Sequence, residues 1–218
     1  MAKVIIVGTS HISKDSIQEA TETILRERPD CVALELDPER FAALLQKKRE
    51  KASLRNPTYF VLNTLQTYLG GKTGVLPGSE MVAAIRAARE VRSQIALIDM
   101  DISEIMGRLG EISRWQKLKL FFKLLAGLVP LPGQKNFDLS KVPAEKMIDE
   151  ALRYMKRGMP TIYRILITDR NEYMANWIRQ LSKTHRKIVV VVGAGHKKGL
   201  EKLLKKRSNR PSASRSKK

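Results

Sequence analysis

The chain has 218 residues, and its 41 lysines and arginines against 22 acidic residues give a formal net charge of +19. This length favours one domain, since a domain typically spans roughly 100–200 residues. Hydrophobic residues make up 43% of the chain, which excludes wholesale disorder, and a single cysteine, Cys31, excludes an intramolecular disulfide framework. The positive charge by itself suggests nucleic acid or an anionic membrane as a partner. Whether it indicates such a partner depends on where the charged residues lie in the sequence.

Four short runs rich in valine, isoleucine and leucine predict buried strands. They cover residues 4–8, 31–36, 95–99 and 188–193. A continuous apolar run is typical of a parallel strand that is covered on both faces. Because a helical pattern follows each run, the sequence predicts an α/β fold with a mainly parallel sheet and flanking helices.

Helix start signals lie between the first three predicted strands. Ser13 can cap a helix with apolar residues as far as Leu25, and Asp37 followed by Pro38 starts the next helix. An Asn-Pro pair at 56–57 repeats this signal before residues 59–69, and Ser79 precedes a helix through residue 91. We therefore expect helices to connect these strands.

Residues 102–182 contain no strand pattern. Their apolar spacing predicts helices over residues 102–109, 112–128, 143–157 and 160–182. We therefore expect an all-helical insertion between the last two strands. Its apolar helices also offer a surface through which a homodimer could form.

Histidines and acids gather at the carboxyl ends of the predicted strands. The first strand leads into Gly8 and His11, and the last leads into Gly193 and His196, so two of the three histidines follow matching Gly-x-x-His patterns. The second strand carries Glu35, and the third ends in Asp99-Met100-Asp101. Ligands of open parallel sheets bind outside the carboxyl ends of the strands, so we expect a site there. The third histidine, His185, precedes the last strand, which predicts a surface position at the opposite edge.

This constellation suits two chemistries. Histidines and a carboxylate can hold a divalent metal that keeps a position open for water. Alternatively, one histidine acts as general base, a carboxylate orients it and an arginine stabilises an oxyanion. A histidine after a strand also commonly serves as a turn or cap residue, so a purely structural role stays open.

Three further positions carry charge near this edge. Arg40 lies one turn past Asp37, and Glu80 lies in the first turn of its helix, where the helix dipole alone explains an acid. Residues 169–172 form a polar cluster that includes Arg170, inside an otherwise apolar helical segment. An exposed face with local ion pairs is the alternative explanation for that cluster.

The excess positive charge is concentrated near the end of the sequence. Residues 197–218 contain ten lysines and arginines and one acid, and residues 208–218 lack any large apolar residue. We therefore expect a single domain over residues 1–207, followed by a disordered basic tail. The tail suits solubility, with weak contact to an anionic surface as the alternative, and the sequence contains no specific nucleic-acid motif.

No stretch of the sequence predicts a signal peptide or a spanning helix. The apolar run at residues 4–7 is too short for a signal peptide, and no run approaches the ~20 apolar residues of a transmembrane helix. We expect a cytoplasmic protein. The basic amphipathic segment at 115–131 leaves peripheral membrane contact open.

Taken together, these residues resemble the TraB family, which includes the pheromone-shutdown (PrgY-like) proteins of conjugative plasmids and is related to Tiki metalloproteases and GumN-like proteins. Arg108 matches, as do the segments GTSHISKDS (8–16), PDCVALELDPERF (29–41), PGSEMVAAIRAA (77–88), LIDMDI (97–102), DRNEYMA (169–175) and VVGAGHKKG (191–199). Two positions depart from the usual pattern: Met100 replaces an arginine and Asn171 replaces an aspartate. Many relatives continue into membrane-spanning helices after the last motif.

The resemblance implies a hydrolase that cleaves a peptide-type substrate and depends on a divalent metal such as Mn, Co or Zn. It implies that His11 and His196 bind the metal together with Glu35, which also activates water. The positions that it implies as supporting are Arg40, Glu80, Asp99, Asp101, Arg108 and Arg170. The alternative is a protein that binds and sequesters a peptide or another small ligand without chemistry.

Overall fold

The computed structural model describes residues 2–9, 14–45, 78–113 and 144–208. Its sheet contains β1 (Lys3–Thr9), β2 (Cys31–Leu34), β3 (Gln94–Leu97) and β4 (Lys187–Gly193). These strands lie in the order β1-β4-β2-β3, and each neighbouring pair is parallel. The predicted α/β fold with a parallel sheet is confirmed.

The sheet is built around β4, whose residues from Ile188 to Gly193 are buried. Its valine run pairs with β1 on one side and β2 on the other, which explains why this run is continuous and apolar. β2 and β3 end two residues earlier than the sequence predicts. The cause in β2 is a tight turn, because the Leu36 amide donates to the Leu34 carbonyl at 2.8 Å.

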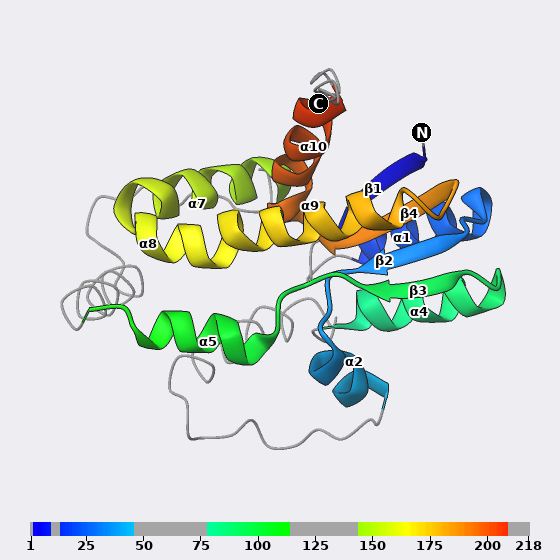
Figure 1. Ribbon diagram of the computed structural model, residues 1–218, viewed down its shortest axis with the longest axis horizontal. Coiled ribbons are helices and arrows are strands. Elements are labelled where there is room, and N and C mark those ends of the chain that lie inside the picture. Colours follow the sequence, from blue (N-terminus) through cyan, green and yellow to red (C-terminus); the bar gives the residue numbers. More distant parts are fainter. Residues whose placement is uncertain (1, 10–13, 46–77, 114–143, 209–218) are drawn as a thin grey trace, which may run out of the picture.

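Helices cover both faces of the sheet, so the fold has three layers (Figure 1). On one face, α1 (Lys14–Glu27) and α4 (Ser79–Glu90) pack residues such as Ile24 and Ile85 against Val189 and Val191. On the other face, α9 (Asp169–Leu181) and α10 (Ala194–Ser208) pack against the alternate residues of the strands. Because successive strand residues point to opposite faces, the single β4 run serves both cores.

Cys31 lies in the core beneath α9 and α10. Burial raises the pKa of its thiol to about 11. The thiol therefore stays protonated at neutral pH, and Cys31 serves the core as a small apolar residue.

The described part of the predicted insertion contains helices and no strand. Its elements are α5 (Ile102–Gly110), α7 (Ala144–Gly158), α8 (Pro160–Tyr163) and the π-helical segment η2 (Arg164–Thr168), which leads directly into α9. They share a small core that includes Met100, Ile105 and Ile165. Figure 1 shows these helices extending beyond the carboxyl ends of the strands.

Several predicted boundaries can be compared with the structure. α2 (Pro38–Leu45) begins at the predicted Asp-Pro signal, and α4 begins at Ser79, preceded by Gly78 with a φ of 84°. The single helix predicted over 160–182 is interrupted by η2. Ser13, the helix predicted over 59–69, nearly all of the helix predicted over 112–128 and the tail beyond residue 208 lie outside the described residues. In the described ranges, no helix is both long and apolar enough to cross a membrane.

Candidate functional site

A cluster of buried charges lies at the carboxyl ends of the strands. Glu35 follows β2 directly, and Asp99 lies two residues beyond β3. α10 starts immediately after β4 and carries His196 in its first turn, while α9 contributes Arg170. The structure therefore brings four of the predicted site residues together from four different elements.

Arg170 is the centre of this cluster. Its Nη2 forms an ion pair with Glu35 Oε1 and lies 2.6 Å from Asp99 Oδ2, and its Nε donates to Asp99 Oδ1 at 3.0 Å. Its Nη1 donates to the Leu166 carbonyl at 3.2 Å, one turn back along the helix. The side chains are 13% exposed for Arg170, 10% for Glu35 and 0% for Asp99. Burial opposes the charge of Arg170, but the two carboxylates outweigh it and raise its pKa.

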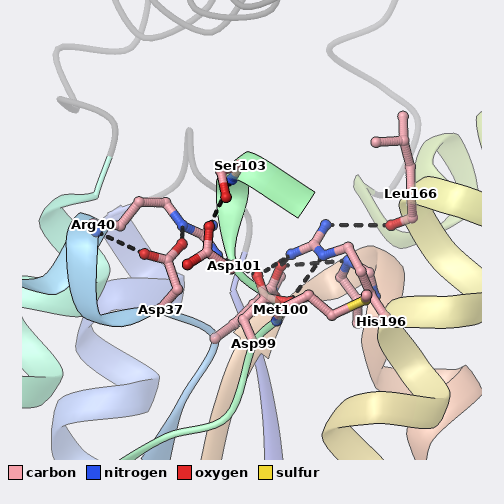
Figure 2. A network of polar contacts seen from close by, with 11 residues as sticks. Asp37, Arg40, Asp99, Met100, Asp101, Ser103, Leu166 and His196 are labelled. Carbon is pink, nitrogen blue, oxygen red and sulfur yellow. Dashed lines mark hydrogen bonds and ion pairs between the residues drawn. The ribbon is translucent and has the colours of Figure 1, made fainter. Parts of the chain in front are cut away.

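Arg40 extends the cluster toward the solvent. Its guanidinium pairs with both Asp37 and Asp99, and its backbone amide donates to Asp37 Oδ1 at 2.9 Å (Figure 2). Burial opposes its charge too, yet Asp99 and Asp37 raise its pKa. With a side chain 31% exposed, Arg40 is the more accessible of the two cluster arginines.

His196 lies between an amide and a carboxylate. Its Nδ1 lies 2.7 Å from Asn171 Oδ1, and its Nε2 lies 3.4 Å from Glu35 Oε1. The other oxygen of Glu35 accepts the backbone N–H of Gly193 at 2.6 Å. Within this Gly-x-x-His turn, Gly193 donates a hydrogen bond to Glu35 and His196 contacts the same carboxylate. This arrangement can orient an imidazole for proton transfer.

The start of the other Gly-x-x-His pattern lies beside this turn. β1 and β4 pair in register so that Gly8 lies opposite Val192 and Thr9 opposite Gly193. A Cβ on Gly8 would come within 2.9 Å of Lys197 Cδ, so only glycine lets the Lys197 side chain pass this closely. His11 lies outside the described residues, and its place in the site stays a prediction.

The remaining predicted positions lie around the cluster. Asp101 is exposed and caps α5 by accepting the Ser103 amide at 2.7 Å, and its hydrogen bonds to Ser103 lower the pKa of its carboxyl. Arg108 pairs with Glu104 at 2.6 Å and with Asp169 at 3.1 Å. Glu80 is buried in the first turn of α4. Because α4 leads into β3, its first turn lies at the same edge of the sheet.

Comparison with known proteins identifies the family of this fold and site. The model of the TraB/PrgY/gumN family matches residues 2–211. The chain belongs to the TraB/PrgY/gumN family. The match includes the strand-end residues of the cluster and the helices of the insertion.

Similar proteins of the family occur in archaea and animals. An uncharacterized protein of Methanocaldococcus jannaschii is 33% identical over 94% of this chain and 54% of its own length. TraB domain-containing proteins of Bos taurus and Homo sapiens are 27% and 26% identical over 92% of this chain and 62% of their own length. The chain thus spans little more than half the length of these relatives.

Two residues that depart from the usual TraB pattern have clear structural positions. Met100 is buried in the small core of the insertion, packed with residues such as Ile105 and Ile165. The amide oxygen of Asn171 accepts a hydrogen bond from His196 Nδ1, a contact that an aspartate oxygen could also accept. The asparagine therefore preserves the hydrogen bond but removes a negative charge beside the histidine.

Two contributors to the cluster were not predicted as site residues. The sequence predicts Asp37 as the end of the second strand and as a helix cap, and Asn171 as a departure from the family pattern, but neither as a site residue. The position of Asp37 at the end of a strand was a usable signal. The contact of Asn171 depends on how α9 packs on α10, for which the sequence offers no direct signal.

The described donors do not by themselves fit a divalent metal. A catalytic zinc typically has three protein ligands, whereas His196 Nε2 and Glu35 Oε1 are the two candidate donors here. Among the residues that the structure describes, no group of three or more metal-ligating side chains is present. Glu35 is moreover bound by Arg170 and by the Gly193 amide, which compete with a cation. A metal would need His11 as a further ligand.

Proposed function

We propose that this TraB-family chain is a hydrolase that acts on a peptide-type substrate at the carboxyl edge of its sheet. The observation that supports this proposal best is the contact of His196 with Glu35, which also forms an ion pair with Arg170. An imidazole next to a fixed carboxylate can serve as a general acid or base. A network of this kind is also common at functional sites, where charges are held against the cost of burial.

Each side chain of the cluster has a role in this proposal. Glu35 orients His196 and activates a water molecule, while Arg170 pairs with Glu35 and holds it in place. Arg40 stabilises the negative charge that develops on the substrate, because it is more exposed than Arg170 and closer to the solvent. A divalent ion such as Mn, Co or Zn is part of the proposal only if His11 joins His196 and Glu35, and its chemistry would be polarisation of the scissile carbonyl.

A second candidate function is binding of a peptide or another small ligand without turnover. It is favoured by the extent to which the cluster's charges pair with one another, since both oxygens of Asp99 and both of Glu35 accept hydrogen bonds. A network of mutually paired charges suits a rigid binding site as well as a catalytic one.

Hydrolysis of a peptide library tests the proposal. The full chain is incubated with the library in buffer with chelator and in buffers with Mn, Co or Zn, and the products are identified by mass spectrometry. We expect cleavage by the wild type and a loss of roughly 100-fold or more in the His11→Ala/His196→Ala double variant, the range for removal of an acid–base group. Equal turnover and equal metal binding by both proteins would contradict the site assignment. Ligand binding in chelator without any turnover would instead favour the second candidate.

Other predicted properties of the chain remain proposals. They are a cytoplasmic location, a homodimer that forms through the helical insertion and weak contact of the basic tail with an anionic surface. Sedimentation of the full chain over a range of concentrations would test the dimer.

A further inference from the structure

A groove of about 330 Å³ lies next to the cluster, between the insertion and the sheet domain. Its walls come from α7, α8, η2, α9 and the first turns of α10. This volume is near the lower end of the range of small-ligand pockets, roughly 300–1,000 Å³, and suits one or two residues of a peptide.

The charge of the groove is positive. Arg153, Lys156 and Lys198 line it together with a single acid, Asp149. Lys198 and Asp149 form an ion pair with each other, so the uncompensated positive charge of the lining comes from Arg153 and Lys156. Both are exposed on α7 and lie within one turn of each other. A lining of this kind favours an anionic ligand, and a guanidinium binds a carboxylate with two parallel hydrogen bonds.

The groove also has an apolar side. Leu152, Tyr163 and Ile167 contribute to its walls, and Lys156 Nζ lies 5.8 Å from the centre of the Tyr163 ring. Gly195 and Gly199 line the part formed by α10, where the lack of side chains keeps the groove open. A ligand that places an apolar side chain next to a negative charge matches both kinds of wall.

One residue connects the groove to the cluster. Asn171 lines the groove, and its amide oxygen lies 2.7 Å from His196 Nδ1. A ligand in the groove would therefore end one side chain away from the imidazole. The Asn171 contact therefore places the groove next to the cluster.

We propose that this groove binds a carboxylate of a short peptide next to an apolar side chain, with Arg153 and Lys156 as the carboxylate-binding residues. The inference rests on the proposed function for the peptide character of the ligand. The carboxylate can belong to the C-terminus of the peptide or to an acidic side chain, and the experiment distinguishes the two.

The test measures binding of N-acetylated, unlabelled tetrapeptides to the full chain by isothermal titration calorimetry, with chelator present. Three peptides share an Ala-Ala-Leu core: one has a free C-terminus, one is amidated, and one is amidated but carries a glutamate. We expect at least one carboxylate peptide to bind about tenfold or more tightly than the neutral amide, as for a charge-assisted hydrogen bond. Tighter binding of the peptide with the free C-terminus identifies the C-terminal carboxylate as the ligand, and tighter binding of the glutamate peptide identifies an acidic side chain.

Two double variants of α7 complete the design. Arg153→Gln/Lys156→Gln should abolish the preference for the carboxylate peptides. Lys146→Gln/Arg157→Gln removes the same charge from exposed positions of the same helix that do not line the groove, and should keep the preference. All four positions are exposed, so the fold should tolerate both variants.

Several results would overturn the inference. They are equal binding of all three peptides, no binding of any, retention of the preference in Arg153→Gln/Lys156→Gln, and binding of inorganic phosphate in place of the peptides. The proposed hydrolysis fails separately: a chain that shows the predicted preference but cleaves no peptide leaves the groove inference intact. Conversely, cleavage that ignores the carboxylate contradicts the groove inference alone.

Discussion

Replacing Arg170 with alanine should lower the free energy of unfolding by about 3–5 kcal/mol, the range for removing one partner of a buried ion pair. The substitution leaves Glu35 and Asp99 without their shared cation, and both carboxylates are buried. In the variant, Asp99 still pairs with Arg40 and accepts the Met100 amide. Glu35 still accepts the Gly193 amide and contacts His196, but it loses its ion pair. Urea denaturation followed by circular dichroism measures the change.

Arg108→Ala is the matched control for this measurement. Arg108 also pairs with two carboxylates, but its side chain is 40% exposed and those of Glu104 and Asp169 are 47% and 27% exposed. Exposed pairs contribute little, so the control should lower stability by less than about 1 kcal/mol. If Arg170→Ala were as mild as Arg108→Ala, the cluster would not be the strongly coupled network described here.

Gly199→Ala should destabilise the protein by about 1–3 kcal/mol, the usual cost of overpacking a core. A Cβ at this position would lie 2.3 Å from Asn171 Nδ2, so the asparagine must move. Asn171 is buried, and a shift of its amide breaks the 2.7 Å contact with His196. We therefore expect the variant also to lose the activity or binding that depends on the histidine. Thermal unfolding and the peptide assay measure the two effects.

Gly195→Ala provides the control, because it makes the same change one turn earlier in α10. A Cβ there would lie 3.8 Å from Leu152 Cδ1, an ordinary contact. Alanine is favoured over glycine in helices by roughly 1 kcal/mol, so this variant should be as stable as the wild type or more so. Equal stability of Gly195→Ala and Gly199→Ala would contradict the packing of Asn171 against α10.

The fold could be predicted largely from the sequence because its strands are unusually distinct. The run at 188–193 is buried on both faces, and this burial requires the apolar residues that marked it as a central strand. The strand ends were less predictable, since backbone hydrogen bonds continue beyond both strands, from the Glu35 amide to the Val191 carbonyl and from the Asp99 amide to the Leu36 carbonyl. Parallel topology forces all carboxyl ends to one edge, and for this reason the sequence could predict that Glu35, Asp99 and His196 lie close together.

The contacts of Arg170 could not be predicted from helical spacing. An exposed face with local ion pairs was one explanation of residues 169–172, yet Arg170 is nearly buried and pairs with Glu35 and Asp99, which are distant in sequence. The five-residue π-helical segment η2 ends two residues before Arg170. A π-helical segment changes the angular position of every residue that follows, so a regular 3.6-residue period misplaces them.

The position of His185 at the opposite end of the strands could be predicted from the sequence, and this histidine serves as a control for ligand binding near His196. The structure places it at the amino edge of the sheet, as predicted, where its Nε2 lies 3.0 Å from the side-chain oxygen of Gln94, the first residue of β3. It is partly buried by contact with the end of α9, including the Leu181 carbonyl at 3.0 Å. It therefore lies at the opposite end of the strands from His196.

The central claim is that ligands bind at the carboxyl edge of the sheet, where His196 lies and where His11 is predicted. The most direct measurement is an NMR spectrum of the full chain with ¹⁵N-labelled histidine, recorded while Mn²⁺ is added. Because a bound paramagnetic ion broadens the signals of nearby nuclei, we predict early loss of the signals of His11 and His196, while the signal of His185 persists. Equal broadening of all three histidines, or loss of the His185 signal first, would contradict the claim, while three unchanged signals would contradict the binding of a divalent ion by His11 and His196.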